Sequence, residues 1–290
     1  MERRELDKNT GTTLPVLGLG TWQYRAGVEP LRAGIALGAR FIDTAESYGS
    51  EAIVGEAIAG VRKDIFLATK VSPRHFRYPD VIRAADQSLQ KLNTEYIDLY
   101  QLHWPNYTIP IEETIGALES LIDQGKIRFM GVSNFMLPDL KKARRATSKH
   151  QIVSNQVRFN LIDRTIEDKL LQYCQESGIT VIAHSPLATG LQGIRAMDPE
   201  DVLGNIARAK SRTVAQVALN WCFAHPGIVT IPKASSVEHV TENCGAADFT
   251  LSPEEMQLLS SKVQFHRRGL LERGLRRVAR HALQLTGRNQ

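Results

Sequence analysis

The sequence reads Phe41-Ile42-Asp43-Thr44-Ala45 in one stretch, Ile65-Phe66-Leu67-Ala68-Thr69-Lys70 in a second and Tyr96-Ile97-Asp98-Leu99-Tyr100-Gln101-Leu102-His103 in a third. Each stretch is an apolar run typical of a buried strand, with an ionisable side chain toward its carboxyl end. The carboxyl ends of successive parallel strands meet at one end of a sheet or barrel, which is where α/β active sites form. The three stretches therefore predict a fold class and the place of a site within it.

Similar runs recur along the rest of the chain at fairly even spacing. They are Val16–Gly20, Ile127–Val132, Asn155–Phe159, Thr180–His184 and Ile228–Pro232. About eight strands that alternate with helical patterns predict an α/β fold, the (β/α)8 TIM barrel. The alternative is a doubly wound open sheet. It is disfavoured because Gly18-Leu19-Gly20 continues with Thr21 and Trp22, and so lacks the third glycine of a dinucleotide fingerprint.

Two segments depart from this regular alternation. Asn9-Thr10-Gly11 is a turn signal within Leu6–Leu14, so we expect a short N-terminal β-hairpin that closes the bottom of the barrel. The stretch from Ala188 to Gly227 is long, and we expect it to hold an extra loop as well as a helix. Long loops over strand ends often cover sites.

Composition suits one soluble α/β domain, because the chain has 290 residues, 42% of them hydrophobic and 23% charged. The three cysteines, Cys174, Cys222 and Cys244, are widely spaced, without disulfide-framework or zinc-type spacing, and suit the reducing cytoplasm. The charged N-terminus, Met1–Glu5, lacks an apolar signal core. No apolar run approaches the ~20 residues of a membrane helix.

The net charge of +5 is concentrated near the C-terminus, in the arginine-rich segment from His266 to Arg288. We therefore divide the chain into a barrel, residues 1–262, and a basic tail, residues 263–290. The tail's apolar residues fall near one helical face: Leu271, Leu275, Val278, Ala282 and Leu285. We expect an amphipathic helix packed on the barrel; the alternative is binding to an anionic membrane surface or an acidic partner. Nucleic-acid binding is not expected, because no stacking platform or recognition motif accompanies the arginines.

Tyr48 follows the first of the three stretches and completes a chemical set with Asp43, Lys70 and His103. An unperturbed tyrosine has a pKa near ~10, too high for an efficient acid at neutral pH. We expect the ammonium of Lys70, held by Asp43, to lower that pKa. His103 would donate to a carbonyl oxygen while Tyr48 protonates it. None of the four can supply a hydride, so the set predicts a nicotinamide cofactor.

Each of these residues also has an ordinary structural interpretation. A lone Asp–Lys pair is usually structural, a histidine at a strand end is often a hydrogen-bonded core residue, and Tyr48-Gly49 could form only a turn. Their position at the ends of three consecutive strands favours a site.

Several motifs along the chain resemble those of the aldo-keto reductases, and they follow one another in the same order as in that family. They are Gly38–Ala45 with Glu51 and Val54-Gly55, Leu102–Pro105, Gly131–Phe135, and Ile231–Lys233 with Glu242-Asn243. The resemblance covers roughly residues 5–262 and is to the prokaryotic, short-loop members. It implies the barrel fold and the reduction of aldehydes or ketones to alcohols with NADPH.

The resemblance also implies roles by position. Asp43, Tyr48, Lys70 and His103 match the catalytic tetrad, with Tyr48 as general acid. The matching cofactor contacts are Thr21 and Asp43 beside the nicotinamide, Ser133, Asn134 and Gln156 at its carboxamide, His184 against its ring, Ser185 and Leu187 at the pyrophosphate, and Lys233, Ser235, Ser236, His239, Glu242 and Asn243 toward the adenosine 2′-phosphate. Trp22 and Trp104 match walls of the substrate pocket. Ser235 and Ser236 also precede a helical pattern, whose N-terminus favours a phosphate.

Two positions depart from the family pattern, and the C-terminal end, Phe265 to Gln290, does not resemble the family's usual substrate-covering tail. His184 stands where a tyrosine usually stacks on the nicotinamide, and an imidazole has a smaller ring whose charge varies with pH. His239 replaces an arginine that typically flanks the 2′-phosphate. Lys233 still supplies a cation there, so we expect NADP to remain the preferred cofactor, by a reduced margin.

The sequence therefore predicts an NADPH-dependent reductase of small carbonyl compounds that needs no metal. Two alternatives remain open. The same enzyme could work mainly as an alcohol dehydrogenase, because the chemistry is reversible. Otherwise, the protein could be an NADP-binding redox sensor or scaffold with slow turnover.

Overall fold

The computed structural model describes residues 1–267, 269, 272, 275 and 278–279. Eight parallel strands form one sheet in which each strand pairs with the next along the chain. The strands are β3 (Leu19–Gly20), β4 (Phe41–Asp43), β5 (Phe66–Val71), β6 (Ile97–Leu102), β7 (Ile127–Ser133), β8 (Ile152–Arg158), β9 (Thr180–His184) and β10 (Ile228–Thr230). This order, with a helix after nearly every strand, confirms the predicted α/β barrel.

The first and last strands close the ring through backbone contacts. The amide of Gly18 donates to the carbonyl of Thr230 at 2.8 Å, and the amide of Thr230 donates to the carbonyl of Val16 at 2.8 Å. Gly20 lies so close to the end of β10 that an added Cβ would stand 2.6 Å from the carbonyl oxygen of Ile231. Glycine at this position therefore lets the two strand ends approach.

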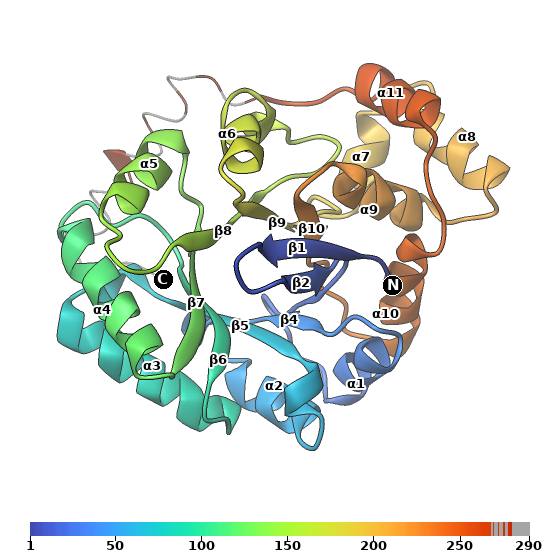
Figure 1. Ribbon diagram of the computed structural model, residues 1–290. Coiled ribbons are helices and arrows are strands. Elements are labelled where there is room, and N and C mark those ends of the chain that lie inside the picture. Colours follow the sequence, from blue (N-terminus) through green and yellow to red (C-terminus); the bar gives the residue numbers. More distant parts are fainter. Residues whose placement is uncertain (268, 270–271, 273–274, 276–277, 280–290) are drawn as a thin grey trace.

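Helices surround the strands on the outside (Figure 1). They are α1 (Glu29–Ala36), α2 (Glu51–Ile58), α3 (Tyr78–Leu92), α4 (Ile111–Asp123), α5 (Leu137–Arg145), α6 (Leu170–Glu176), α7 (Leu191–Ala196), α8 (Val202–Ala209), α9 (Val214–Ala224), α10 (Val237–Cys244) and α11 (Pro253–Lys262). The long β9–β10 connection, expected to hold an extra loop and a helix, contains α7 and α8 before α9.

Strand alternation divides the core into two apolar layers. Phe41, Phe66 and Leu99 belong to the cluster inside the barrel, whereas Ile42 and Leu67 belong to the larger cluster between strands and helices. This is the alternation expected of strands with one face in the barrel and the other under helices. Because Asp43 is two residues beyond Phe41, it too points into the barrel.

The predicted N-terminal hairpin is formed by β1 (Arg3–Asp7) and β2 (Thr12–Pro15), and it lies across the centre of the ring of strands (Figure 1). Leu6 and Leu14 are buried in the inner cluster with Phe41 and Phe66, the first residues of β4 and β5. The hairpin therefore closes the amino-terminal end of the barrel and leaves the carboxyl end for a site.

The predicted amphipathic helix of the tail lies mostly outside the described residues, including Leu271, Ala282 and Leu285. Two members of its apolar face are described, and Leu275 and Val278 are 72% and 68% exposed. The expected packing on the barrel is therefore wrong at these two positions. Among the described residues, no helix is both long and apolar enough to cross a membrane.

The hairpin's contribution to stability can be tested at Leu14, which is fully buried. Leu14→Ala should lower the free energy of unfolding by ~2–5 kcal/mol, because it leaves a cavity at the barrel floor. Glu5→Ala, an exposed site on β1, should change it by less than ~0.5 kcal/mol. Chemical denaturation measures both, and equal small effects would show that the hairpin does not support the core.

Candidate active site

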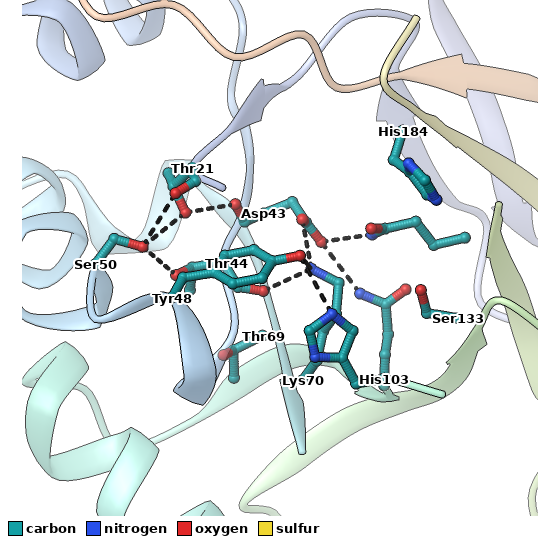
Figure 2. Close-up of polar contacts among 12 residues, drawn as sticks. Thr21, Asp43, Thr44, Tyr48, Ser50, Thr69, Lys70, His103, Ser133 and His184 are labelled. Carbon is teal, nitrogen blue, oxygen red and sulfur yellow. Dashed lines mark hydrogen bonds and ion pairs between the residues drawn. The ribbon is translucent and has the colours of Figure 1, made fainter. Parts of the chain in front are cut away.

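Four ionisable side chains meet at the carboxyl end of the barrel (Figure 2). Asp43 ends β4, Lys70 lies on β5, His103 follows β6, and Tyr48 ends a single 3-10 turn, η1 (Glu46–Tyr48), in the loop after β4. The Nζ of Lys70 donates to Asp43 Oδ2 at 2.6 Å and lies 3.4 Å from the Tyr48 hydroxyl. The structure thus brings together the four residues that the sequence singled out.

Lys70 is fully buried, and its charge is stabilised by two acceptors, Asp43 and the carbonyl oxygen of Thr44 at 2.8 Å. Burial alone lowers the pKa of Lys70, but Asp43 and Tyr48 more than offset it, so that this pKa lies above its ordinary value. The lysine therefore remains an ammonium at neutral pH.

The carboxylate of Asp43 is fixed from two further sides. Its Oδ1 accepts from Gln156 Nε2 at 2.7 Å and from Gln101 Nε2 at 3.2 Å, while Oδ2 faces Lys70. Donors on several sides fix the orientation of this buried carboxylate. The contact of Gln101 with Asp43 was not predicted from the sequence. The sequence feature that could have predicted this contact is the spacing of Gln101 and His103, which places them on the same face of the strand.

The hydroxyl of Tyr48 lies between Lys70 and the Nε2 of His103, which is 3.3 Å away. Burial raises the pKa of Tyr48 above its ordinary value, and the charge of Lys70 opposes this rise without overcoming it. The expectation that Lys70 brings this pKa below the ordinary value is therefore wrong for the protein without bound ligand. The phenol is fully protonated at neutral pH.

His103 is neutral at physiological pH. Burial, followed by the charges of Lys70 and His184, lowers the pKa of His103 to about 3. Its ring contacts Tyr48 through Nε2, while Nδ1 lies 3.5 Å from the Ser47 hydroxyl. A neutral imidazole can donate one hydrogen bond and accept another, so His103 can bind a carbonyl oxygen without carrying charge.

A second group of polar side chains lies beside the first, at the ends of β7, β8 and β9. Asn134 Nδ2 donates to Ser133 Oγ at 3.0 Å, and its Oδ1 is 3.3 Å from His184 Nε2. The amide nitrogen of Gln156 is used by Asp43, which leaves its amide oxygen to accept. These four residues offer donors and acceptors in one place, as recognition of a carboxamide requires.

Hydroxyl groups join the Tyr48 loop to the neighbouring strands (Figure 2). The Oγ of Ser50 lies 2.9 Å from the hydroxyls of both Thr21 and Thr44, and Thr21 Oγ1 donates to the backbone oxygen of Asp43. Thr21 was expected to contact the cofactor, and the structure places it in this buried network. Ser50 was missed, because nothing in its local sequence marks it.

The residues expected at the phosphate groups lie around the start of α10. Ser236 caps this helix by accepting from the amide of His239 at 3.2 Å, and Lys233 and Ser235 are exposed beside it. His239 is exposed, and its Nδ1 lies 3.5 Å from Glu242 Oε2. A helix N-terminus beside a lysine is suited to an anion.

The remaining predicted site residues lie in three places. Ser185, which directly follows β9, has its hydroxyl 3.1 Å from His184 Nδ1, and Leu187 is half-buried nearby in sequence. The ring of Trp104 stacks near His103 with centroids 6.3 Å apart, whereas Trp22 is 58% exposed. Asn243 is buried on α10. Sequence position alone did not indicate these differences in exposure.

The described part of the chain contains neither a metal-binding cluster nor a reactive thiol. No group of three or more His, Cys, Asp or Glu side chains there is placed to hold a metal ion. The three cysteines are buried and free. Burial raises the pKa of Cys174 to about 12, which leaves its thiol unreactive.

Comparison with known proteins agrees with this geometry. Residues 16–264 match the model of the aldo/keto reductase family. The chain is 39% identical to the methylglyoxal reductase YeaE of Escherichia coli, over 89% of this chain and 94% of that protein. It is 37% identical to a glyoxal reductase of Bacillus subtilis, over 87% and 90%.

A solved structure of an aldo-keto reductase from Klebsiella pneumoniae in complex with NADPH superimposes with a TM-score of 0.84. It is 39% identical, and the match covers 92% of this chain and 98% of that one. The chain belongs to the aldo/keto reductase family.

Proposed function

We propose that this protein reduces small aldehydes and ketones to alcohols with NADPH, and that Tyr48 donates the proton. The observation that carries the proposal is the position of the Tyr48 hydroxyl, 3.4 Å from the buried ammonium of Lys70 and 3.3 Å from His103. The names of the Escherichia coli and Bacillus subtilis relatives support methylglyoxal and glyoxal, which are small dicarbonyl compounds, as first substrates to test.

The residues present fit an NADP cofactor. Ser133, Asn134, Gln156 and His184 would hold the nicotinamide end through its carboxamide and ring, since they gather donors and acceptors at the barrel mouth. Lys233 and the start of α10 would hold the phosphate end. When bound, NADPH supplies the hydride that the side chains cannot supply.

The side chains provide the proton and the stabilisation of charge. As negative charge develops on the carbonyl oxygen, neutral His103 donates a hydrogen bond to it and Tyr48 transfers its proton, giving the alcohol. The ammonium of Lys70 stabilises the phenolate that remains, and Asp43 holds that ammonium in place. Each charge that appears on the protein therefore has a neighbour of opposite sign.

The protonated state of Tyr48 at neutral pH suits the catalysis of reduction. Because burial raises its pKa, the phenol is protonated at neutral pH and is ready to give a proton. Oxidation of an alcohol needs the phenolate, whose population is small at this pH. We therefore favour reduction over alcohol oxidation, and the intact set of four residues favours turnover over a slow redox sensor.

The proton donor can be tested with Tyr48→Phe. This change removes the hydroxyl and keeps the ring, so turnover of methylglyoxal should fall by ~10²–10⁴-fold, the usual contribution of general acid catalysis. NADPH affinity, measured by fluorescence titration, should be retained. Wild-type turnover in Tyr48→Phe would exclude Tyr48 as the donor.

The coupling between Tyr48 and Lys70 can be read from pH profiles. Activity should decline as the pH rises through the Tyr48 pKa, because the phenolate cannot donate. In Lys70→Met the opposing charge is lost, so the decline should move to still higher pH while the plateau rate falls. His103, with a pKa of about 3, should produce no change between pH ~5 and ~8. An alkaline decline at the same pH in both proteins would contradict the coupling.

Cofactor preference can be tested at His239, which is exposed and paired with Glu242. His239→Arg places a permanent cation near the expected 2′-phosphate, so it should tighten NADPH binding by ~0.2–1 kcal/mol, the range of exposed ion pairs. NADH lacks this phosphate and serves as the control. Fluorescence titration gives both dissociation constants. Unchanged NADPH affinity would show that His239 does not face the 2′-phosphate.

A further inference from the structure

Tyr48 and Lys70 lie on different elements, so their separation must be fixed by contacts between those elements. Lys70 is part of β5, whereas Tyr48 belongs to η1, a turn of three residues that lies outside the sheet. A loop residue of this kind has no strand hydrogen bonds to fix its height above the barrel. Besides the hydroxyl network around Ser50, two carboxylates connect this loop to the chain of β5.

The first carboxylate is Glu51, three residues after Tyr48 and the first residue of α2. It is 1% exposed, and its Oε1 accepts from the hydroxyl of Thr69 at 2.8 Å. Thr69 directly precedes Lys70 on β5. Lys91 Nζ, at 3.9 Å from Oε2, is the nearest cation. A buried carboxylate needs a specific partner, and the Thr69 hydroxyl supplies one on β5.

The second carboxylate is Glu46, two residues before Tyr48 on η1. Its Oε1 accepts from the backbone amide of Ser72 at 2.6 Å and lies 3.0 Å from His75 Nδ1. Ser72 is two residues after Lys70. The Tyr48 loop is therefore tied to the chain of β5 on both sides of Lys70, by one carboxylate on each side of Tyr48.

We propose that Glu46 and Glu51 form a carboxylate clamp that fixes the distance between the Tyr48 phenol and the Lys70 ammonium, and so sets the rate of proton donation. The two glutamates are positioning residues, since they act through Tyr48. This inference rests on the proposed role of Tyr48 as proton donor. A displacement of about 1 Å in a reacting group can lower a rate by ~10²-fold, so a loosened clamp has a measurable effect.

A matched control is available in Glu119 on α4. It is also a buried glutamate that ties a loop, with its Oε1 accepting from the amides of Ser148 and Lys149 at 2.7 Å. That loop joins α5 to β8 and carries none of the four central side chains. Glu119→Gln should therefore reduce stability without changing turnover.

The test combines each clamp variant with Tyr48→Phe. Glu51→Ala, Glu51→Gln, Glu46→Gln and Thr69→Val are made in the wild type and in Tyr48→Phe, and kcat, KM, NADPH affinity and melting temperature are measured for each. In the wild type, Glu51→Ala should lower kcat by ~10–100-fold with KM and NADPH affinity nearly unchanged. Glu51→Gln keeps an acceptor for Thr69 and should retain more activity. In the Tyr48→Phe background, none of these four substitutions should lower the residual rate further.

Two outcomes would overturn the clamp. One is an equal fall in kcat in both backgrounds, which would show that the glutamates act without Tyr48. The other is unchanged kcat in folded variants. Thr69→Val removes only one hydroxyl. If the Glu51 variants do not fold, the kcat of Thr69→Val in the two backgrounds provides the same test. Failure of the proposed function is separate, because it would appear as wild-type turnover in Tyr48→Phe alone.

Discussion

The rest of the site depends on the ion pair between Lys70 and Asp43 inside the barrel. An ammonium with no exposed surface is stable only with close acceptors, and Asp43 at 2.6 Å with the Thr44 carbonyl at 2.8 Å meets that need. Asp43 in turn requires donors, which Gln101 on β6 and Gln156 on β8 supply. One buried charge thus determines the upper polar layer of the barrel.

The polar layer lies directly above an apolar layer inside the barrel. Phe41, Phe66 and Leu99 fill the lower interior, and the hairpin with Leu6 and Leu14 closes its floor. Such a core excludes water from beneath the ion pair and strengthens each interaction above it. The same exclusion raises the pKa of Tyr48 and lowers that of His103, so that both are neutral at pH 7. The site therefore holds one permanent ion pair and two neutral groups that meet developing charge.

Much of this arrangement could be predicted from the sequence, because alternation along a strand is a strong signal. Phe41 and Asp43 lie two residues apart and so face the same side of the strand, and the same rule places Lys70 and Gln101 inside the barrel. Strand limits were less predictable, since β8 begins at Ile152, before the expected start at Asn155. The direction of the Tyr48 pKa was missed, because the neighbouring charge is visible in the sequence whereas the degree of burial is not. The contact of Thr69 with Glu51 joins residues 18 positions apart and needs the folded chain to be seen.

The most direct test of this account is the ionisation of Tyr48 itself, followed by carbon-13 NMR of tyrosine-labelled protein without cofactor, with the resonance assigned from Tyr48→Phe. We expect a pKa above the ordinary value of ~10, and a still higher one in Lys70→Met, because burial dominates and the lysine opposes it. A pKa below ~10 would show that burial does not dominate at Tyr48. A pKa that does not change in Lys70→Met would contradict the central role of the buried ion pair.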